Sequence, residues 1–370
     1  MKILHLVSCR GWSSDAYWAA RAAGELERRG HQVTLGCRAG TEHAVIDRAR
    51  REGVSSIATF TFAGGVHPGV DLGDVRRLRA AIAAADVVHV HRGKEHWLAA
   101  VAARLAGGRP IVRTRHIAQA VRPHAGNRWL YGRATALVVT VTEAIRGQCL
   151  AARLLSPERI VTLAGGADAE AYRPAPAVPA VRHALGGEDN RPLVGLVSGL
   201  RVMKGHRVVI DAAARLAAAG VRPRIVFVGG GPTERALRHA IAKAGLDEQV
   251  VMAGFVSDLP RVMAALDVGL YVPLESDGMS RVVFEYLAAG RPLIAARVGV
   301  VAEVLTDGTH AALVPAGDAA ALAARLAALL DDAALRARLG EAGRNLVVER
   351  YSGARLAAGL ETHYARLTAA

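Results

Sequence analysis

Short apolar segments alternate with longer helical segments along almost the entire chain. Lys2–Val7 is short and apolar like a buried strand, residues 15–29 have helical periodicity and end at Gly30, and Gln32–Leu35 is apolar again. The alternation continues, with further predicted strands at 56–60, 87–90, 110–114, 136–141 and 159–163. Strands that alternate with helices in this way favour an α/β fold built on a parallel, doubly wound sheet.

A second series of strands and helices begins near residue 191. Its predicted strands lie at 193–197, 224–228, 250–252, 268–272, 293–295 and 311–314. The preceding stretch, 172–191, is rich in proline and glycine and has little periodicity, which is typical of an interdomain linker. A chain of 370 residues is long enough for two complete cores. We predict a first domain at 1–172, a linker at 173–190, a second domain at 191–352 and a closing helix within 353–370.

Composition argues against a membrane-spanning or secreted protein. The chain is 52% hydrophobic, but no uncharged apolar run is long enough to cross a bilayer. The first residues fit an opening strand better than a signal peptide. Cys9, Cys37 and Cys149 are widely separated, with no pair at a redox or metal-ligand spacing. The simplest interpretation is a reduced, cytoplasmic protein.

The net charge of +14 is concentrated in the first half of the chain. Residues 1–175 contain 25 Lys and Arg against 14 Asp and Glu, and residues 176–370 contain 22 against 19. A basic first half suits an acidic partner, which leaves nucleic acid, an anionic membrane surface and a phosphorylated acceptor as alternatives.

The segment from Glu275 to Pro292 is the strongest candidate for a ligand site. It follows a predicted strand as a polar loop and then enters an apolar helix that stops near Gly290. Ligands bind at the carboxyl ends of strands in such sheets. The amides of Gly278, Met279 and Ser280 would lie at the helix N-terminus and suit a phosphate, while carboxylates accept hydrogen bonds from sugar hydroxyls. The alternative is an acidic first turn that only complements the helix dipole.

Asp277 and Glu285, separated by seven residues, resemble the Glu-x7-Glu signature of the family 4 retaining glycosyltransferases. The resemblance implies the GT-B fold, in which two Rossmann-like domains face each other across a cleft and the last helix packs back on the first domain. It also implies that Glu285 holds the ribose of a sugar nucleotide. Asp277 would lie beside the transferred sugar, where the family has Glu, and Glu275 is a competitor for that role.

Two other segments of the second half resemble donor-binding parts of the family. Lys204 resembles the lysine that binds the diphosphate, where a cation offsets the charge that grows on the leaving nucleotide. The family's arginine five residues earlier is Gly199 here, and Arg201 is the nearest replacement. Gly254 and Val256 resemble the segment whose backbone lines the nucleobase. For the glycine-rich turn at 229–231, close approach to a nucleotide and tight turning without a ligand are equally good interpretations.

Histidines near predicted strand ends are candidates for chemistry in the first half. The resemblance implies that His116, which follows the strand at 110–114, lies beside the donor sugar and is important for transfer; the alternative is a capping or merely exposed histidine. His89, His91 and His96 could be considered for a metal, but no carboxylate or cysteine completes a set, so we expect none. The first strand-to-helix turn has Gly11 but no Gly-x-Gly-x-x-Gly, which argues against a dinucleotide site.

A basic segment surrounds His116. It consists of Arg113, Arg115, Arg122, His124 and Arg128, with Trp129 and Tyr131 close behind. Such a segment suits nucleic acid, an anionic lipid headgroup or a phosphorylated sugar acceptor, and a solvated surface is the alternative for any single arginine.

We therefore interpret the chain as a retaining GT-B glycosyltransferase that moves a sugar from a UDP-, GDP- or ADP-sugar to a hydroxyl of a glycan or glycolipid. No Asp-x-Asp metal motif is evident, so we expect no metal or other cofactor. We expect a role in lipopolysaccharide or other envelope polysaccharide synthesis, in the cytoplasm or peripherally at the inner face of the cell membrane. The alternatives are a nucleotide-sugar 2-epimerase on the same fold and, more remotely, a basic nucleic-acid-binding module; we expect no nucleic-acid partner.

Overall fold

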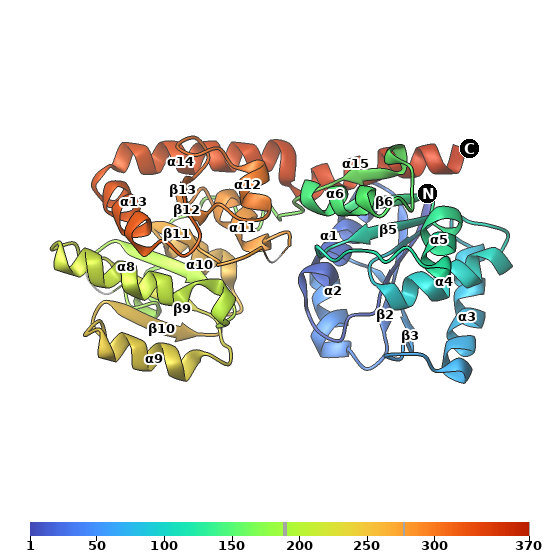
Figure 1. The fold of residues 1–370 in the computed structure, drawn as a ribbon, viewed down its shortest axis with the longest axis horizontal. Coiled ribbons are helices and arrows are strands. Elements are labelled where there is room, and N and C mark those ends of the chain that lie inside the picture. The colour runs from blue at the N-terminus through green and yellow to red at the C-terminus, as the bar shows by residue number, and fades with distance from the viewer. Residues whose placement is uncertain (188–190, 277, 370) are drawn as a thin grey trace. The chain divides into compact units, whose positions relative to one another are not determined.

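The computed structural model describes residues 1–187, 191–276 and 278–369 (Figure 1). It divides into two compact units. The first contains Met1–Gly166 and the C-terminal segment from Gly353 onward, and the second contains Ala167–Ser352. Each unit is a parallel sheet with helices packed on it, as the alternation in the sequence predicts.

The sheet of the first unit has seven parallel strands in the order β3-β2-β1-β4-β5-β6-β7. Their bounds are β1 (Lys2–Val7), β2 (Gln32–Arg38), β3 (Ser56–Phe60), β4 (Val87–Val90), β5 (Ile111–Arg115), β6 (Leu137–Thr140) and β7 (Ile160–Thr162). The helices are α1 (Ser14–Arg28), α2 (Asp47–Arg51), α3 (Pro68–Ala83), α4 (Gly93–Leu105), α5 (Ala125–Trp129), α6 (Glu143–Ala151) and α15 (Gly353–Ala369). The strand order reverses between β1 and β4, and ligands bind outside the carboxyl ends of strands at such a point.

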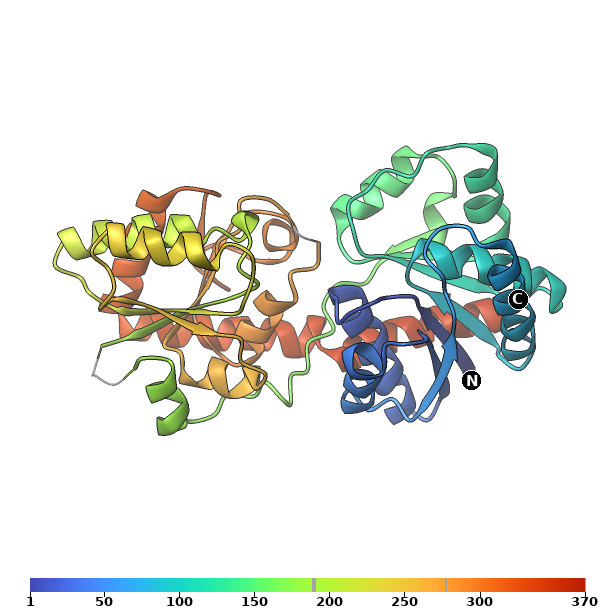
Figure 2. The ribbon, with the colours of Figure 1, turned by 90° about the horizontal axis from the view of Figure 1, so that it is seen from below.

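Helix α15 completes the first unit from the other end of the chain. It lies against α1, so that the last helix of the sequence and the first one are side by side (Figure 2). Glu361 of α15 pairs with Arg29, and His31 Nε2 lies 3.0 Å from Glu361 Oε1. Tyr364, one turn further on, is fully buried and reaches the interior beside β4.

The sheet of the second unit has six parallel strands in the order β10-β9-β8-β11-β12-β13. Their bounds are β8 (Leu193–Val197), β9 (Arg224–Val228), β10 (Val250–Gly254), β11 (Val268–Tyr271), β12 (Leu293–Ala296) and β13 (Ala312–Val314). The helices are α7 (Pro179–Ala184), α8 (His206–Ala218), α9 (Glu234–Lys243), α10 (Leu259–Ala265), α11 (Arg281–Ala288), α12 (Val300–Val304), α13 (Ala319–Asp331) and α14 (Ala333–Leu346). Here the order reverses between β8 and β11, so the loops after these two strands form the expected ligand edge.

The central strands of the second sheet are buried on both faces, which explains why they appear in the sequence as continuous apolar runs rather than as alternating ones. Every residue of β8, β11 and β12 is buried. Covering both faces of a parallel sheet with helices requires this pattern. Single turns of 3-10 or π-helix supplement the α-helices at Glu42–Ile46, Leu130–Ala134, Pro157–Arg159, Val202–Lys204 and Val347–Tyr351.

The structure differs from the predicted boundaries at the join. The first unit ends at Gly166 rather than at residue 172. The segment predicted as a linker, 173–190, contains α7, and its residues 188–190 lie outside the described part of the chain. Arg182 of α7 donates to the carbonyl of Ala265 at 2.8 Å and pairs with Asp267 at 2.9 Å. These contacts make α7 part of the second unit, and periodicity could not show them because the helix has only six residues.

In the part of the chain that the structure describes, no helix combines the length and the apolar character needed to cross a membrane.

Candidate active site

Two loops meet at the ligand edge of the second unit. The loop after β8 runs from residue 198 to 205, and the loop after β11 runs from 272 to 280. Leu274 N donates to Met203 O at 2.8 Å, which holds the loops together. At Gly205 a Cβ atom would lie 1.9 Å from Val272 O, and φ is +77°. Only glycine fits here, so the start of α8 and its neighbour Lys204 stay close to the loop after β11.

Glu285 is buried at this edge with one carboxylate oxygen satisfied and the other not. Its side chain projects from α11 and is 1% exposed. Oε1 pairs with Arg281 Nε at 2.9 Å. Oε2 is buried and has no hydrogen-bond partner among the described residues. A buried carboxylate oxygen without a donor costs free energy, so Oε2 is suited to accept hydrogen bonds from a ligand.

The residue next to Glu285 fixes α11 against the sheet. The hydroxyl of Tyr286 accepts a hydrogen bond from Val197 N at 2.9 Å and donates to Gly195 O at 2.8 Å. Its ring packs over Gly269 of β11, where a Cβ atom would come within 2.5 Å of the ring. The rotation of α11 about its axis is therefore defined, and with it the direction in which the Glu285 side chain leaves the helix.

The backbone before α11 adopts a sparsely populated conformation. Gly278 has φ +91°, and the non-glycine residue Ser280 has φ +52°. The Ser280 hydroxyl bonds to that of Tyr271, and both residues, like Met279, are buried. A left-handed serine costs about 1 kcal/mol or more, and such strain concentrates at ligand sites. The predicted amides of Gly278, Met279 and Ser280 thus precede α11 in a constrained turn; Asp277 lies outside the described residues.

Lys204, which is predicted to bind phosphate, lies between Met203 and Gly205, the two residues that contact the loop after β11. Lys204 is half-buried, and burial together with its charge lowers the pKa of His206 to about 4. Arg201 is exposed on the same loop. A Cβ atom at Gly199 would make only ordinary contacts, so packing does not explain why glycine stands there.

The glycine-rich turn after β9 supports its neighbour loop. A Cβ atom at Gly229 would lie 2.0 Å from Ser198 O, and one at Gly231 would lie 2.4 Å from Leu200 O. These glycines let two backbones pack closely, which favours tight turning over contact with a nucleotide. Gly254 (φ +69°) accepts a hydrogen bond from Gly229 N at 2.7 Å, so the segment predicted to line the nucleobase, with half-buried Val256, joins the same loop cluster.

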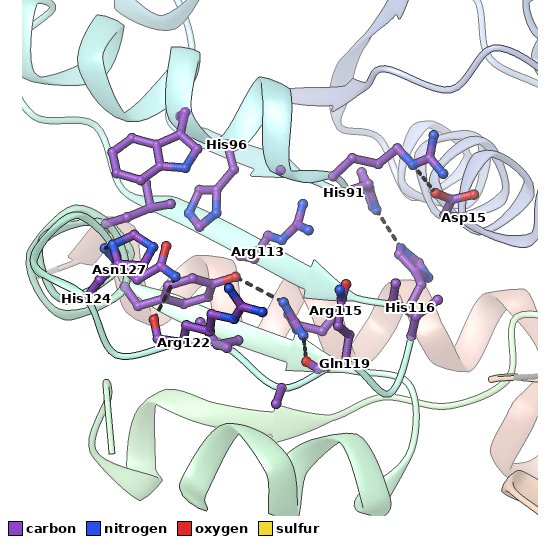
Figure 3. A pocket seen from close by; sticks show the side chains of 18 residues that line it. Asp15, His91, His96, Arg113, Arg115, His116, Gln119, Arg122, His124 and Asn127 are labelled. Atoms are coloured by element: carbon purple, nitrogen blue, oxygen red, sulfur yellow. Dashed lines mark hydrogen bonds and ion pairs between the residues drawn. The ribbon is translucent and has the colours of Figure 1, made fainter. Parts of the chain in front are cut away.

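The first unit contains a cavity of about 430 Å³ at the carboxyl ends of β4 and β5 (Figure 3). We call it the His116 pocket. Its wall includes Asp15, His91, Arg92, Gly93, His96, Trp97, Arg113, Arg115, His116, Ile117, Gln119, Ala120, Val121, Arg122, His124, Asn127, Leu130 and Tyr131. A second cavity of about 540 Å³ shares Arg92 with it and contacts the loop at Gly11 that precedes α1.

His116 ends a chain of hydrogen bonds that crosses the interior of the unit. Its Nε2 lies 3.2 Å from His91 Nδ1 (Figure 3). His91 Nε2 in turn lies 3.2 Å from His5 Nδ1. His5 Nε2 then lies 3.3 Å from the Tyr364 hydroxyl, which also contacts His89. Each neutral imidazole has one donor and one acceptor, so the donors along such a chain all point in one direction or all in the other. His116 can therefore present its second nitrogen, Nδ1, as a donor or as an acceptor.

Burial keeps these imidazoles neutral. It lowers the pKa of His5 to about 3, and it lowers those of His89 and His91 well below their usual value. For His116, burial also lowers the pKa, while the Asp15 carboxylate acts in the opposite direction. The pocket thus presents an uncharged histidine at neutral pH.

Three of these histidines also satisfy the spacing of a metal site. Ring nitrogens of His5, His89 and His91 lie within 4.8 Å of one another. The sequence showed only the last two, because His5 comes from β1 and joins them across the sheet. His96, the third histidine of the sequence interpretation, lies elsewhere and bonds to Thr135 at 2.8 Å.

The neutral histidines should make the first unit sensitive to acid. Their pKa values are lower in the folded protein than the unfolded value of about 6.5, so the unfolded chain binds protons that the folded chain does not. Stability is complete above pH 6.5 and is lost as the pH falls toward the folded pKa values. Each fully neutral histidine accounts for about 2 kcal/mol at pH 5, so for His5, His89, His91 and His96 we expect a loss of at least about 4 kcal/mol between pH 7.5 and 5.

Urea unfolding followed by tryptophan fluorescence measures this loss, because all four tryptophans lie in the first unit. His96→Asn should reduce the pH dependence, and His43→Asn, at a 98% exposed side chain, should not. Equal stability of the wild type at both pH values would contradict the assignment of neutral histidines.

The basic residues predicted around His116 divide into two groups. Arg113, Arg115, Arg122 and His124 line the His116 pocket, together with Tyr131. Arg128 does not line it, and its Nε donates to Pro123 O at 3.0 Å. Trp129 stacks on Trp97 at 5.8 Å between ring centroids. The solvated-surface alternative therefore fits Arg128 best.

Sequence reasoning did not assign Asp15 and Arg92 to the site. Asp15 pairs with Arg92 at 2.8 Å in the wall of the pocket. Both follow strands at the reversal point of the sheet, β1 and β4. That position is the signal that could have identified them.

Comparisons with known proteins show the family of this chain. Residues 17–171 match the family model for "Glycosyltransferase Family 4", and residues 179–346 match that for "Glycosyl transferases group 1". A 2-deoxystreptamine glucosyltransferase from Streptomyces kanamyceticus is 31% identical, over 76% of this chain and 78% of its own length. A D-inositol 3-phosphate glycosyltransferase from Mycobacterium marinum is 29% identical, over 66% of this chain and 55% of its own length.

Solved structures share the fold at low identity. HepE from Anabaena, in complex with UDP and glucose, has a TM-score of 0.81 and 21% identity, with 99% of both chains covered. A glycosyltransferase from Rickettsia africae has a TM-score of 0.85 and 19% identity, with 99% of this chain and 98% of its own covered. The chain is therefore an enzyme of the family 4, group 1 glycosyltransferases, and its two parallel-sheet units are those of the GT-B fold.

Proposed function

We propose that this glycosyltransferase transfers a sugar from a nucleotide sugar to a hydroxyl group of a glycan or glycolipid acceptor with retention of configuration. The donor nucleotide binds the second unit and the acceptor binds the first. The observation that carries the proposal is Oε2 of Glu285 in the second unit, which is buried and has no hydrogen-bond partner in the part of the chain that the structure describes. Ribose hydroxyls are donors that satisfy such an oxygen.

The loops beside Glu285 supply groups that suit a diphosphate. Lys204 is the cation, with Arg201 on the same loop, and the amides before α11 are positive ends of backbone dipoles. Together they stabilise the charge that develops on the leaving nucleotide, which is the role a metal ion has in other enzymes. Asp277 or Glu275 contacts the donor sugar in this proposal, as the family resemblance implies.

The first unit contributes His116 and the acceptor site. Nδ1 of His116 has no hydrogen-bond partner among the residues that the structure describes, and it can act as donor or acceptor toward a substrate hydroxyl. The basic first half of the sequence suits an acceptor at an anionic membrane surface. We therefore place the reaction in the cytoplasm or at the inner face of the membrane, in lipopolysaccharide or other envelope polysaccharide synthesis.

A nucleotide screen tests the donor site. Because HepE was solved with UDP, we expect UDP to raise the thermal unfolding temperature more than GDP or ADP does. The effect should persist in EDTA, since Lys204 and backbone amides, rather than a metal, hold the phosphates. A Lys204→Ala variant should lose most of the shift, while Lys243→Ala, at an exposed lysine at the end of α9, should keep it.

Two results would contradict the proposal. Binding of none of the three nucleotides would remove the donor site. Binding that disappears in EDTA and returns with a divalent cation would show that a metal, and not Lys204, holds the diphosphate.

A further inference from the structure

We propose that the His116 pocket is a subsite for an anionic acceptor, which carries a phosphate or carboxylate group, and that Arg113 is the residue that anchors this group. The inference rests on the proposed function, because it names the acceptor class for the pocket of the first unit. The names of the relatives differ on this point, because one refers to D-inositol 3-phosphate, which carries a phosphate, and another to 2-deoxystreptamine, which carries amines.

Arg113 is a buried cation, and some of its N–H groups have no hydrogen-bond acceptor among the described residues. The residue is 7% exposed and lies in the wall of the pocket. Nε and Nη1 have no acceptor in the part of the chain that the structure describes. Burial lowers the pKa of Arg113, because water no longer stabilises the charge of the guanidinium group. A guanidinium in this state is costly unless an anion arrives to pair with it.

The residues nearest to Arg113 do not complete its coordination. The Tyr131 hydroxyl interacts with it, but the same hydroxyl also accepts a hydrogen bond from Arg115 Nη1 at 3.2 Å. The Glu95 carboxyl attracts the charge, yet Oε1 of Glu95 accepts from Arg92 N at 2.5 Å and Oε2 has no partner among the described residues. Burial also raises the pKa of Glu95, so this carboxyl is a weak counter-charge.

The pocket as a whole is positive. Four arginines and one carboxylate line it, and that carboxylate, Asp15, already pairs with Arg92. Arg113 and Arg115 alternate with Thr114 along β5, so both side chains face the pocket while Thr114 faces His89. Arg122 comes from the loop that follows, and the three guanidinium groups project toward one cavity (Figure 3). A planar, forked donor matches phosphate and carboxylate oxygens.

The position of His116 in the same wall connects the charge to the reaction. An acceptor held by its anionic group at Arg113 would have its hydroxyls inside the pocket that also contains the open nitrogen of His116. The cavity, at about 430 Å³, is within the range of small-molecule sites. An acceptor with protonated amines, such as 2-deoxystreptamine, would instead meet three cations without a counter-charge.

The test compares probes that differ only in charge, with the full chain and no donor present. Calorimetric titration should show that D-inositol 3-phosphate binds at least tenfold more tightly than myo-inositol, and 2-deoxystreptamine should bind more weakly than both. Glucuronate against glucose gives the corresponding comparison for a carboxylate. Whichever anionic probe binds more tightly identifies the anionic group, and high salt should weaken that binding.

Variants then locate the effect. Arg113→Gln should remove most of the preference for the anionic probe. Arg113→Lys should retain part of it, because lysine keeps the positive charge but lacks the planar, two-pronged guanidinium group. Arg128→Gln removes the same charge from the neighbouring surface and should change affinity by less than twofold. If Arg113→Gln fails to fold, as judged by tryptophan fluorescence, exposed Arg122→Gln should still lower affinity severalfold.

Three outcomes would overturn the inference. Equal affinity of the wild type for charged and uncharged probes would show no anionic subsite. Equal losses in Arg113→Gln and Arg128→Gln would show a diffuse surface field rather than a built site. Inorganic phosphate binding as tightly as the sugar phosphate would show a simple anion site and no acceptor site. Nucleotide titration of the same samples keeps the proposed function separate, because UDP binding to the second unit does not depend on Arg113.

Discussion

Replacing Glu285 with glutamine is expected to lower kcat/KM for the nucleotide sugar by at least about 100-fold. Oε2 of Glu285 is buried and lacks a partner among the described residues, while Oε1 pairs with Arg281. Two ribose hydroxyls that donate to a buried carboxylate contribute about 1.5 kcal/mol or more each, and about 3 kcal/mol corresponds to a factor above 100. Glutamine keeps the volume of the side chain but removes the charge. Steady-state kinetics with the nucleotide sugar that binds best measures the effect.

The matched control is Glu341→Gln, at an exposed position on α14 of the same unit. It should leave kcat/KM unchanged. Because the contact is made to the nucleotide and not to the reacting bond, Glu285→Gln should also weaken UDP binding by a similar factor. If Glu285→Gln binds UDP as tightly as the wild type does but has a lower kcat, Glu285 acts at the reacting centre and not on the ribose.

Replacing His116 with asparagine is expected to lower kcat by about 100-fold and to leave UDP affinity within twofold. A positioned acid or base typically contributes 10²–10⁴-fold to a rate, and Asn keeps polarity but cannot exchange a proton. UDP binding is unaffected because His116 belongs to the first unit. The pH profile of the wild type should show no decline of kcat near pH 6.5, since burial lowers the pKa of His116 far below that value.

His43→Asn, at an exposed histidine of the first unit, is the control and should retain full activity. Tyr364→Phe interrupts the hydrogen-bond chain at its far end without touching the pocket. We expect an intermediate loss of kcat from it, because the direction of the chain is no longer fixed. Full activity of His116→Asn would show that the histidine is only a cap or an exposed residue, which is the alternative that the sequence left open.

The fold could be predicted from the sequence because the strands can be recognised as short apolar segments between longer helical ones. Strands such as β8, β11 and β12 are buried, continuous apolar runs, and the predicted strands lie within a few residues of the observed ones. Glu285 and Lys204 were predicted as site residues from the family resemblance, and the structure brings the loops that precede α8 and α11 together through Gly205 and Leu274.

The remaining features depend on contacts between distant residues. His5, His91 and Tyr364 come from the start, the first third and the end of the chain, and only the sheet order and the packing of α15 on α1 bring them together. The incomplete coordination of Arg113 could not be predicted from the sequence either, because the pattern of β5 indicates only a strand that contains two arginines. For Gly229, the close approach of its backbone to Ser198 favours a tight turn over contact with a nucleotide, and the sequence does not contain this contact. Short α7 lacks enough turns for periodicity.

The most direct test of the central claim is a binding cycle that compares UDP and 2′-deoxy-UDP on the wild type and on Glu285→Gln. The cycle isolates the contact between one carboxylate and one ribose hydroxyl from every other effect of the substitution. If Oε2 of Glu285 accepts from the ribose, the wild type binds UDP about tenfold or more tightly than the deoxynucleotide, and the variant binds both equally. If the two nucleotides bind the wild type with the same affinity, Glu285 does not accept a hydrogen bond from the ribose 2′-hydroxyl, and this result would contradict the account.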